Sequence, residues 1–98
     1  MDFEWDENKR QQVIAGRGVD FLDAALIFEG PVVTRPDRRR DYGEERFVSL
    51  GKVDDNYYVV VHTRRGDRTR IISAWLGGKD DQRRYQTSLA RRDQEDEG

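Results

Sequence analysis

The sequence contains no cysteine and only one histidine, His62, among its 98 residues. The absence of cysteine excludes disulfide bonds, thiolate catalysis and cysteine-ligated zinc. A single histidine also argues against a transition-metal site built only from protein ligands. We therefore expect a chain that uses no metal or other cofactor and fits the reducing cytosol.

Long apolar segments are missing as well. No run approaches the ~20 residues that span a bilayer, and the first residues, MDFEWDENK, are acidic, whereas a signal peptide is basic and then apolar. Apolar residues make up 35% of the chain and charged residues 39%, so the core must be small and assembled from short segments. These features predict one small cytoplasmic domain that is neither secreted nor embedded in a membrane.

The two signs of charge are separated along the chain, although the formal net charge is only −2. Residues 1–30 hold seven acidic and three basic side chains, and residues 93–98 add four acidic ones. Residues 31–92 hold fifteen Lys and Arg against nine Asp and Glu. This basic middle section could contact a polyanion such as RNA; the alternative is an ordinary solvated surface.

Apolar periodicity and turn residues predict a single α+β domain over residues 1–92, in the order β-α-α-β-β-β-β-α. A short edge strand comes first, two helices follow Asp6 and Asp20, and these helices cover one side of a small antiparallel sheet. The other strands are expected at 31–34, 46–53, 56–64 and 68–75, and the last helix at 79–92. The acidic tail, residues 93–98, has nothing to bury and is predicted to be disordered.

Alternate side chains of the strand at 56–64 must point to opposite faces of the sheet. Tyr57, Val59 and Val61 share one face, and Tyr58, Val60 and His62 share the other. One face can therefore pack against the helices while the other carries polar groups.

A group of residues suited to RNA cleavage lies around one predicted hairpin. His62 supplies an imidazole for proton transfer, and Arg64 or Arg65, together with Arg70, supplies guanidiniums for the charge on a pentacoordinate phosphate. Further basic side chains could contact phosphates: Lys9, Arg68, Lys79, Arg83 and Arg84. The alternatives are a structural histidine and a solvated basic helix surface.

Five motifs follow one another between Phe3 and Tyr85: FEWDENK, GVDFLDAALIFEG, EERFVSLG, YYVVVHTRRGDRTRIISA and RRY. In this order and spacing they resemble the BrnT family of bacterial type II toxins. The resemblance implies a RelE-like fold, metal-independent RNA cleavage that inhibits translation, and a hetero-oligomer with a BrnA-like antitoxin, a ribbon-helix-helix DNA-binding protein that neutralises the toxin. It also implies functional positions at Trp5, Asp6, Lys9, His62, Arg65, Arg70 and Ser73.

The chain departs from the family pattern at two places. Relatives usually have histidine where Arg17 stands, and arginine followed by a basic residue where Trp75 and Leu76 stand. Arg17 cannot act as a base at neutral pH because guanidinium stays protonated. Two hypotheses follow: a ribonuclease toxin, and a protein that has lost cleavage and binds a partner through Trp75 and Leu76.

Overall fold

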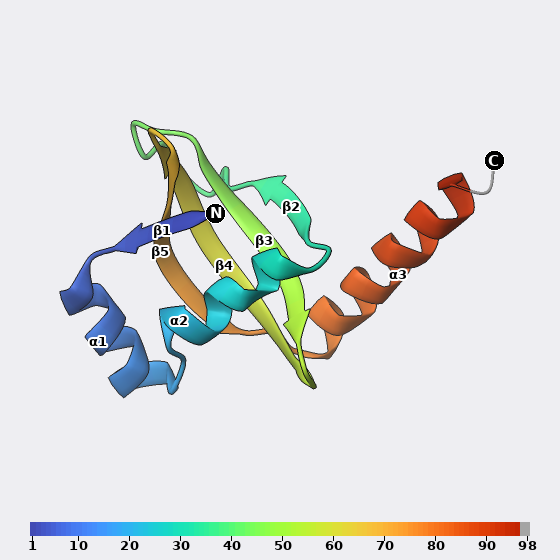
Figure 1. Ribbon diagram of the computed structural model, residues 1–98, viewed down its shortest axis with the longest axis horizontal. Helices are drawn as coiled ribbons and strands as arrows, with labels where there is room; N and C mark the ends of the chain where they lie inside the picture. Colours follow the sequence, from blue (N-terminus) through green and yellow to red (C-terminus); the bar gives the residue numbers. More distant parts are fainter. Residues whose placement is uncertain (97–98) are drawn as a thin grey trace.

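The computed structural model describes residues 1–96 as one mixed sheet with helices on both sides (Figure 1). The strands are β1 (Asp2–Trp5), β2 (Val33–Pro36), β3 (Arg46–Val53), β4 (Asn56–Arg65) and β5 (Arg68–Leu76). The helices are α1 (Glu7–Arg17), α2 (Phe21–Ala24), the 3-10 helix η1 (Ala25–Glu29) and α3 (Lys79–Asp96). The predicted α+β class is confirmed, and η1 continues the short second helix.

The strand order in the sheet is β1-β5-β4-β3-β2. Strands β2 to β5 pair antiparallel, as the meander predicts. β1 instead pairs parallel with β5, with Asp2 opposite Arg68 and Trp5 opposite Ile71. The chain leaves β1 through helices, so no tight hairpin forces β1 to run antiparallel to its neighbour. The expected antiparallel sheet is therefore correct for four strands and wrong for β1.

The helix ends are set by local residues that the sequence identifies. The Asp6 carboxylate accepts a hydrogen bond from the Lys9 amide at 3.2 Å and begins α1. Gly18 ends α1 with a left-handed φ of 68°, a conformation that glycine adopts without strain. Asp20 caps α2 through the Leu22 amide and also binds the Arg10 guanidinium at 2.7 and 2.8 Å. This pair fixes α1 against α2.

The alternation along β4 produces two apolar clusters, one on each side of the sheet. Tyr58 and Val60 pack beneath α1, α2 and η1, and we call this side the helical face. Val59 and Val61 point to the opposite side, which we call the arginine face for the residues described below. There Tyr85 of α3 covers them, so the face expected to carry polar groups also holds a second apolar cluster.

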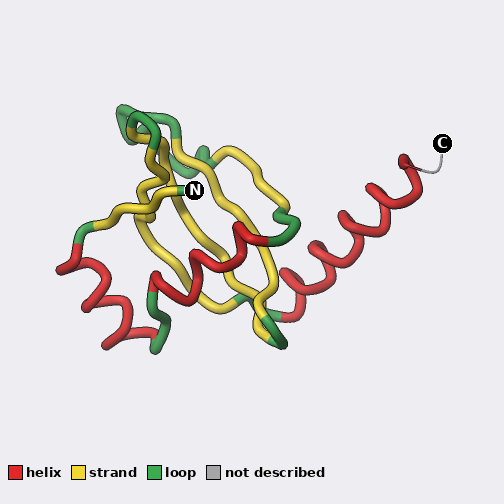
Figure 2. Tube along the Cα trace, in the orientation of Figure 1, coloured by secondary structure: helices red, strands yellow, loops and turns green. Residues whose placement is uncertain are grey.

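Helix α3 runs away from the sheet toward its C-terminal end (Figures 1 and 2), and its contacts with the rest of the domain extend as far as Arg92. The Tyr85 hydroxyl donates to the Pro31 carbonyl at 2.9 Å, and the Arg92 guanidinium donates to the Val32 carbonyl at 2.8 Å. The helix continues to Asp96, so the described part of the expected disordered tail is helical; residues 97–98 lie outside the described residues. None of the described helices is long and apolar enough to cross a membrane.

Close packing at Gly51 yields a stability prediction. A Cβ atom at this position of β3 would lie 2.5 Å from Cβ of Ile27, which is fully buried. We expect Gly51→Ala to lower the free energy of unfolding by about 1–3 kcal/mol, because the core must shift to admit the methyl group. The measurement is the urea midpoint followed by circular dichroism.

The matched control is Gly16→Ala in α1, where an added Cβ meets nothing within 4 Å. This variant should be as stable as the parent or more stable by at most about 1 kcal/mol, since alanine favours helix. Equal urea midpoints for the two variants would show that Ile27 moves to admit the methyl group without a loss in the free energy of unfolding.

Candidate functional site

A row of polar side chains crosses four strands of the arginine face. Arg46 on β3 lies opposite Thr63 on β4, and Thr63 lies opposite Arg70 on β5. Arg70 in turn lies opposite Glu4 on β1. Residues directly opposite one another on neighbouring strands project to the same face. The sheet therefore brings together side chains from sequence positions 4 to 70.

Two carboxylates hold the arginines of this row. The Arg70 guanidinium donates to Glu4 at 3.0 Å. Glu44, in the loop before β3, accepts from Nε of Arg46 at 3.1 Å and lies 3.9 Å from the Arg65 guanidinium. Arg65 lies opposite Arg68 at the hairpin end of the same face. We call these residues the arginine cluster: Glu4, Glu44, Arg46, Arg65, Arg68 and Arg70.

The cluster is oriented but accessible to solvent. The side chains of Glu4, Glu44, Arg46 and Arg70 are 22–29% exposed, and Arg65 is 54% exposed. A guanidinium has five N–H donors, so Arg70 keeps donors for a further oxyanion after binding Glu4. Across residues 1–96 no group of three or more His, Asp or Glu side chains is placed to hold a metal ion. The groups available for chemistry in the cluster are guanidiniums that lie beside carboxylates.

The loop between β2 and β3 contains an ion pair between an exposed guanidinium, that of Arg39, and a buried carboxylate, that of Asp37. The Arg39 guanidinium donates two hydrogen bonds of 2.8 Å to Asp37, which is 6% exposed. These bonds lower the pKa of Asp37 to about 2. The same loop carries Tyr42, whose ring lies 4.1 Å from the Arg46 guanidinium. The loop thereby limits the orientation of one arginine of the cluster.

The two positions that depart from the family pattern are in contact. Arg17 donates to the Ser73 hydroxyl at 2.8 Å and to the Ala74 carbonyl at 3.2 Å, and its guanidinium lies 5.7 Å from the Trp75 ring. β1 ends opposite Ile71, so Arg17 satisfies part of the edge of β5 that β1 leaves unpaired. A cation from α1 therefore stands beside Trp75.

Trp75 and Leu76 do not form one patch. Trp75 lies opposite Val59 on the arginine face, where it is half-buried against that apolar cluster. Leu76 lies opposite Tyr58 on the helical face and is 52% exposed. Neighbouring residues of a strand point to opposite faces, so the expected joint surface is wrong.

His62 lies on the helical face, away from the arginine cluster. Its Nε2 is 2.7 Å from the Ser49 hydroxyl, and its ring meets the Phe28 ring edge-on at 5.1 Å. Burial lowers the pKa of His62 below its usual value. Arg65 and Arg70 project from the other face, so the expected pocket of these three residues is wrong. Arg64 is on the side of His62 and lines the same apolar pocket.

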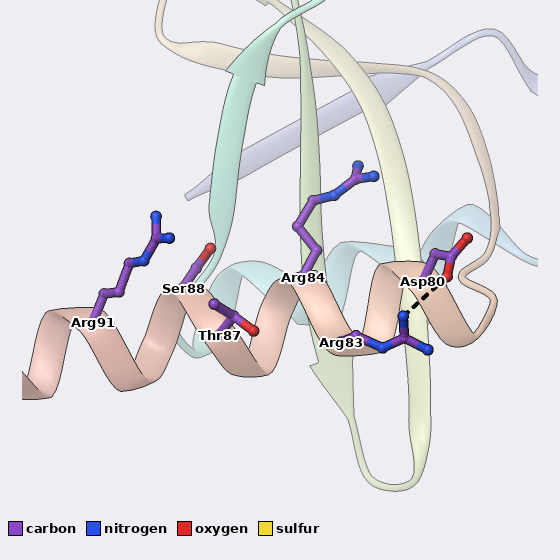
Figure 3. A pocket seen from close by; sticks show the side chains of 6 residues that line it. All are labelled: Asp80, Arg83, Arg84, Thr87, Ser88 and Arg91. Carbon is purple, nitrogen blue, oxygen red and sulfur yellow. Dashed lines mark ion pairs between the residues drawn. The ribbon is translucent and has the colours of Figure 1, made fainter.

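The remaining basic candidates fall into two places. Lys9 is exposed in the first turn of α1, and no hydrogen bond or ion pair among the described residues joins it to the cluster. Lys79, Arg83 and Arg84 lie on α3. In Figure 3 Arg84 and Arg91 project from one side of α3, while Arg83 pairs with Asp80 at 3.7 Å. Arg84 also lines a small hollow against β2, β3 and β4 on the arginine face.

Sequence reasoning missed Glu4, Glu44 and Arg46. For Arg46 a signal existed, because a two-residue turn at positions 54–55 pairs 53 with 56 and therefore 46 with 63. For Glu4 no local signal existed, since its place depends on the parallel pairing of β1 with β5. Glu44 lies in an irregular loop, where spacing predicts no direction.

One family model matches the chain over residues 5–87, and its description is a ribonuclease toxin, BrnT, of type II toxin–antitoxin systems. The match extends from the last residue of β1 into α3 and includes every member of the arginine cluster except Glu4. No curated protein matches the chain.

The environment of His62 predicts how stability depends on pH. Because burial holds its pKa below the ordinary 6.5, the unfolded chain takes up this proton first as the pH falls. The contribution to the free energy of unfolding is fully present above about pH 6.5 and is lost as the pH falls through the folded pKa. We expect urea unfolding between pH 7.5 and 5 to show this loss, and His62→Gln to remove it.

Asp37 provides an internal reference for this measurement. Its pKa falls from an ordinary 3.8 to about 2 in the fold, so its own loss of stability begins only below about pH 4. A decline between pH 7.5 and 5 that is the same in the parent and in His62→Gln would assign the effect to another group.

Proposed function

The chain belongs to the BrnT family of ribonuclease toxins of type II toxin–antitoxin systems. On that basis we propose that it cleaves RNA at the arginine cluster without a metal ion. This cleavage would inhibit translation. The observation that carries this assignment is the carboxylate of Glu44 held between Arg46 and Arg65. A type II toxin has an antitoxin partner. We take that partner to be a BrnA-like ribbon-helix-helix protein that forms a hetero-oligomer with the chain in the cytoplasm.

RNA would lie along the arginine face. The cluster occupies the hairpin end of this face, and the basic side chains of α3 continue from its other end, where Arg84 and Arg35 line one hollow. Arginines along such a path bind successive phosphates, and each contact adds to the salt dependence of binding. The acidic residues of α1 and α2 belong to elements on the helical face, which leaves the arginine face as the cationic side of the molecule.

The cluster supplies a base and cations for cleavage by the RNA 2′-hydroxyl. The 2′-oxygen forms a bond to phosphorus while its proton passes to the Glu44 carboxylate. The bond from phosphorus to the 5′-oxygen breaks, and this oxygen takes a proton from water at the exposed site. The products are a 2′,3′-cyclic phosphate and a 5′-hydroxyl. Arg46, Arg65 and Arg70 stabilise the negative charge that builds up on the phosphoryl oxygens.

We assign no step of this chemistry to His62 or Lys9. His62 is separated from the scissile phosphate by the sheet itself, because it projects to the helical face. Lys9 lies on α1 and has no bonded contact with the cluster in the part of the chain that the structure describes. Proton transfer is therefore assigned to a carboxylate and charge stabilisation to guanidiniums.

One observation favours a second function, a partner-binding protein that has lost cleavage. Arg46, Arg65 and Arg70 each already contact a carboxylate, and such pairing weakens the attraction of an arginine for phosphate. A BrnT protein that has lost cleavage would bind the antitoxin and leave RNA intact. A cleavage assay distinguishes the two functions directly.

Substitutions in the cluster should stop cleavage without unfolding the chain. We expect Glu44→Gln to lower the rate by about 10²–10⁴-fold, because the amide cannot accept the 2′-hydroxyl proton. Arg65→Ala should lower it by about 10²–10³-fold through loss of one charge-stabilising donor. The measurement is cleavage of a fluorescently labelled single-stranded RNA in the presence of EDTA.

The control is His62→Gln at pH 7.5, which changes the opposite face and should cleave at the parental rate. Urea midpoints establish that each variant is folded. Loss of cleavage in His62→Gln, with full activity in Glu44→Gln and Arg65→Ala, would show that the active site does not lie on the arginine face. An inactive parent that still binds its antitoxin would establish the second function.

A further inference from the structure

An apolar groove lies on the helical face, between β1 and the helices α2 and η1. Its volume is about 360 Å³, and its walls include Phe3, Trp5, Leu22, Leu26 and Phe28. Leu22 is 54% exposed and Leu26 is 42% exposed, although both belong to helices whose other sides are buried in the core. Exposed apolar side chains gathered in one groove are typical of a protein-binding surface.

The strand beside this groove is an outer strand of the sheet. β1 pairs with β5 on one side, and within residues 1–96 no strand pairs with its other side. An outer strand presents unpaired N–H and C=O groups that can bind an extended segment of another chain. Phe3 and Trp5 of β1 project into the groove, so backbone pairing and apolar contacts would be made by the same segment.

The rim of the groove is acidic. Glu29 lines the groove and is exposed. Glu7 accepts a hydrogen bond from the Trp5 indole at 3.2 Å, but its charge is paired with Arg10. Asp23 adjoins the lining residue Leu22 and is exposed. Nucleic acid is repelled by such a rim, whereas a peptide with basic side chains is attracted to it.

We propose that this groove and the outer edge of β1 bind an extended segment of the antitoxin that alternates apolar with basic side chains. The proposal rests on the membership of a toxin–antitoxin family and not on the mechanism of cleavage. It differs from the expected patch at Trp75 and Leu76, because the apolar residues of the groove come from β1, α2 and η1 and neither Trp75 nor Leu76 lines it.

Exposed leucines inside and outside the groove give a matched test. The cognate antitoxin is titrated into purified protein, and the dissociation constant is measured by calorimetry. Leu22→Arg should weaken binding about tenfold or more, because the variant places a cation where an apolar anchor and a basic segment must fit. Leu76→Arg, at a leucine that is 52% exposed outside the groove, should bind as the parent does.

Glu29→Lys tests the charge of the bound segment separately. It should weaken binding several-fold at low salt and by less at high salt, since surface charges are screened. Full affinity in Glu29→Lys at low salt would contradict a basic segment. All three variants should keep the parental urea midpoint and the parental RNA cleavage, so that failure here is distinguishable from failure of the cleavage mechanism.

Other outcomes would overturn the assignment. Weak binding by Leu76→Arg with full binding by Leu22→Arg would place the antitoxin at the end of β5. Full binding by both would place it on a third surface. If light scattering shows that the parent alone is a dimer and that Leu22→Arg is a monomer, the groove binds a second copy of the chain instead.

Discussion

The alternation of side chains along β4 is the constraint on which the other features depend. Val60 and Val61 are adjacent in sequence and at most 2% exposed, yet they belong to different apolar clusters on opposite sides of the sheet. A register shift of one residue would exchange the two sets between the clusters and would move His62 to the arginine face. The same alternation places His62 beside the helices and Thr63 in the arginine row. The two faces can therefore carry different functions although they share one strand.

A β-bulge interrupts the alternation of side chains along β5. The bulge determines which face Trp75 projects to. Val61 pairs with Ser73 and His62 with Ile71, so Ile72 is the extra residue. Simple alternation would place Trp75 on the face opposite to Arg70. The bulge returns both to the arginine face. It also begins where β1 ends, at the short unpaired edge that Arg17 reaches. Trp75 thus gains a cation from α1.

The sequence predicted features that depend on neighbouring residues. Capping aspartates and turn residues gave the helix starts and the meander, because caps and two-residue turns act over a few positions. The alternation on β4 already separated His62 from Arg65. The site expected from the sequence nevertheless joined them, because they are close along the chain. The parallel pairing that brings Glu4 to Arg70 joins residues far apart in the chain, and the bulge depends on the fit of two strands. Neither leaves a local pattern that can be identified from the sequence.

The separation of charge along the chain becomes only a partial separation of surfaces, because β1 carries side chains to both faces of the sheet. Glu4 projects to the arginine face and contacts Arg70, while Phe3 and Trp5 project into the apolar groove. A segment paired with the outer edge of β1 would hold this strand in place and with it the Glu4 carboxylate. Glu4 keeps one guanidinium of the cluster partly neutralised, and a firmly held Glu4 competes with phosphate for Arg70. If the arginine face binds RNA as proposed, a partner paired with β1 would weaken that binding without covering the arginine face.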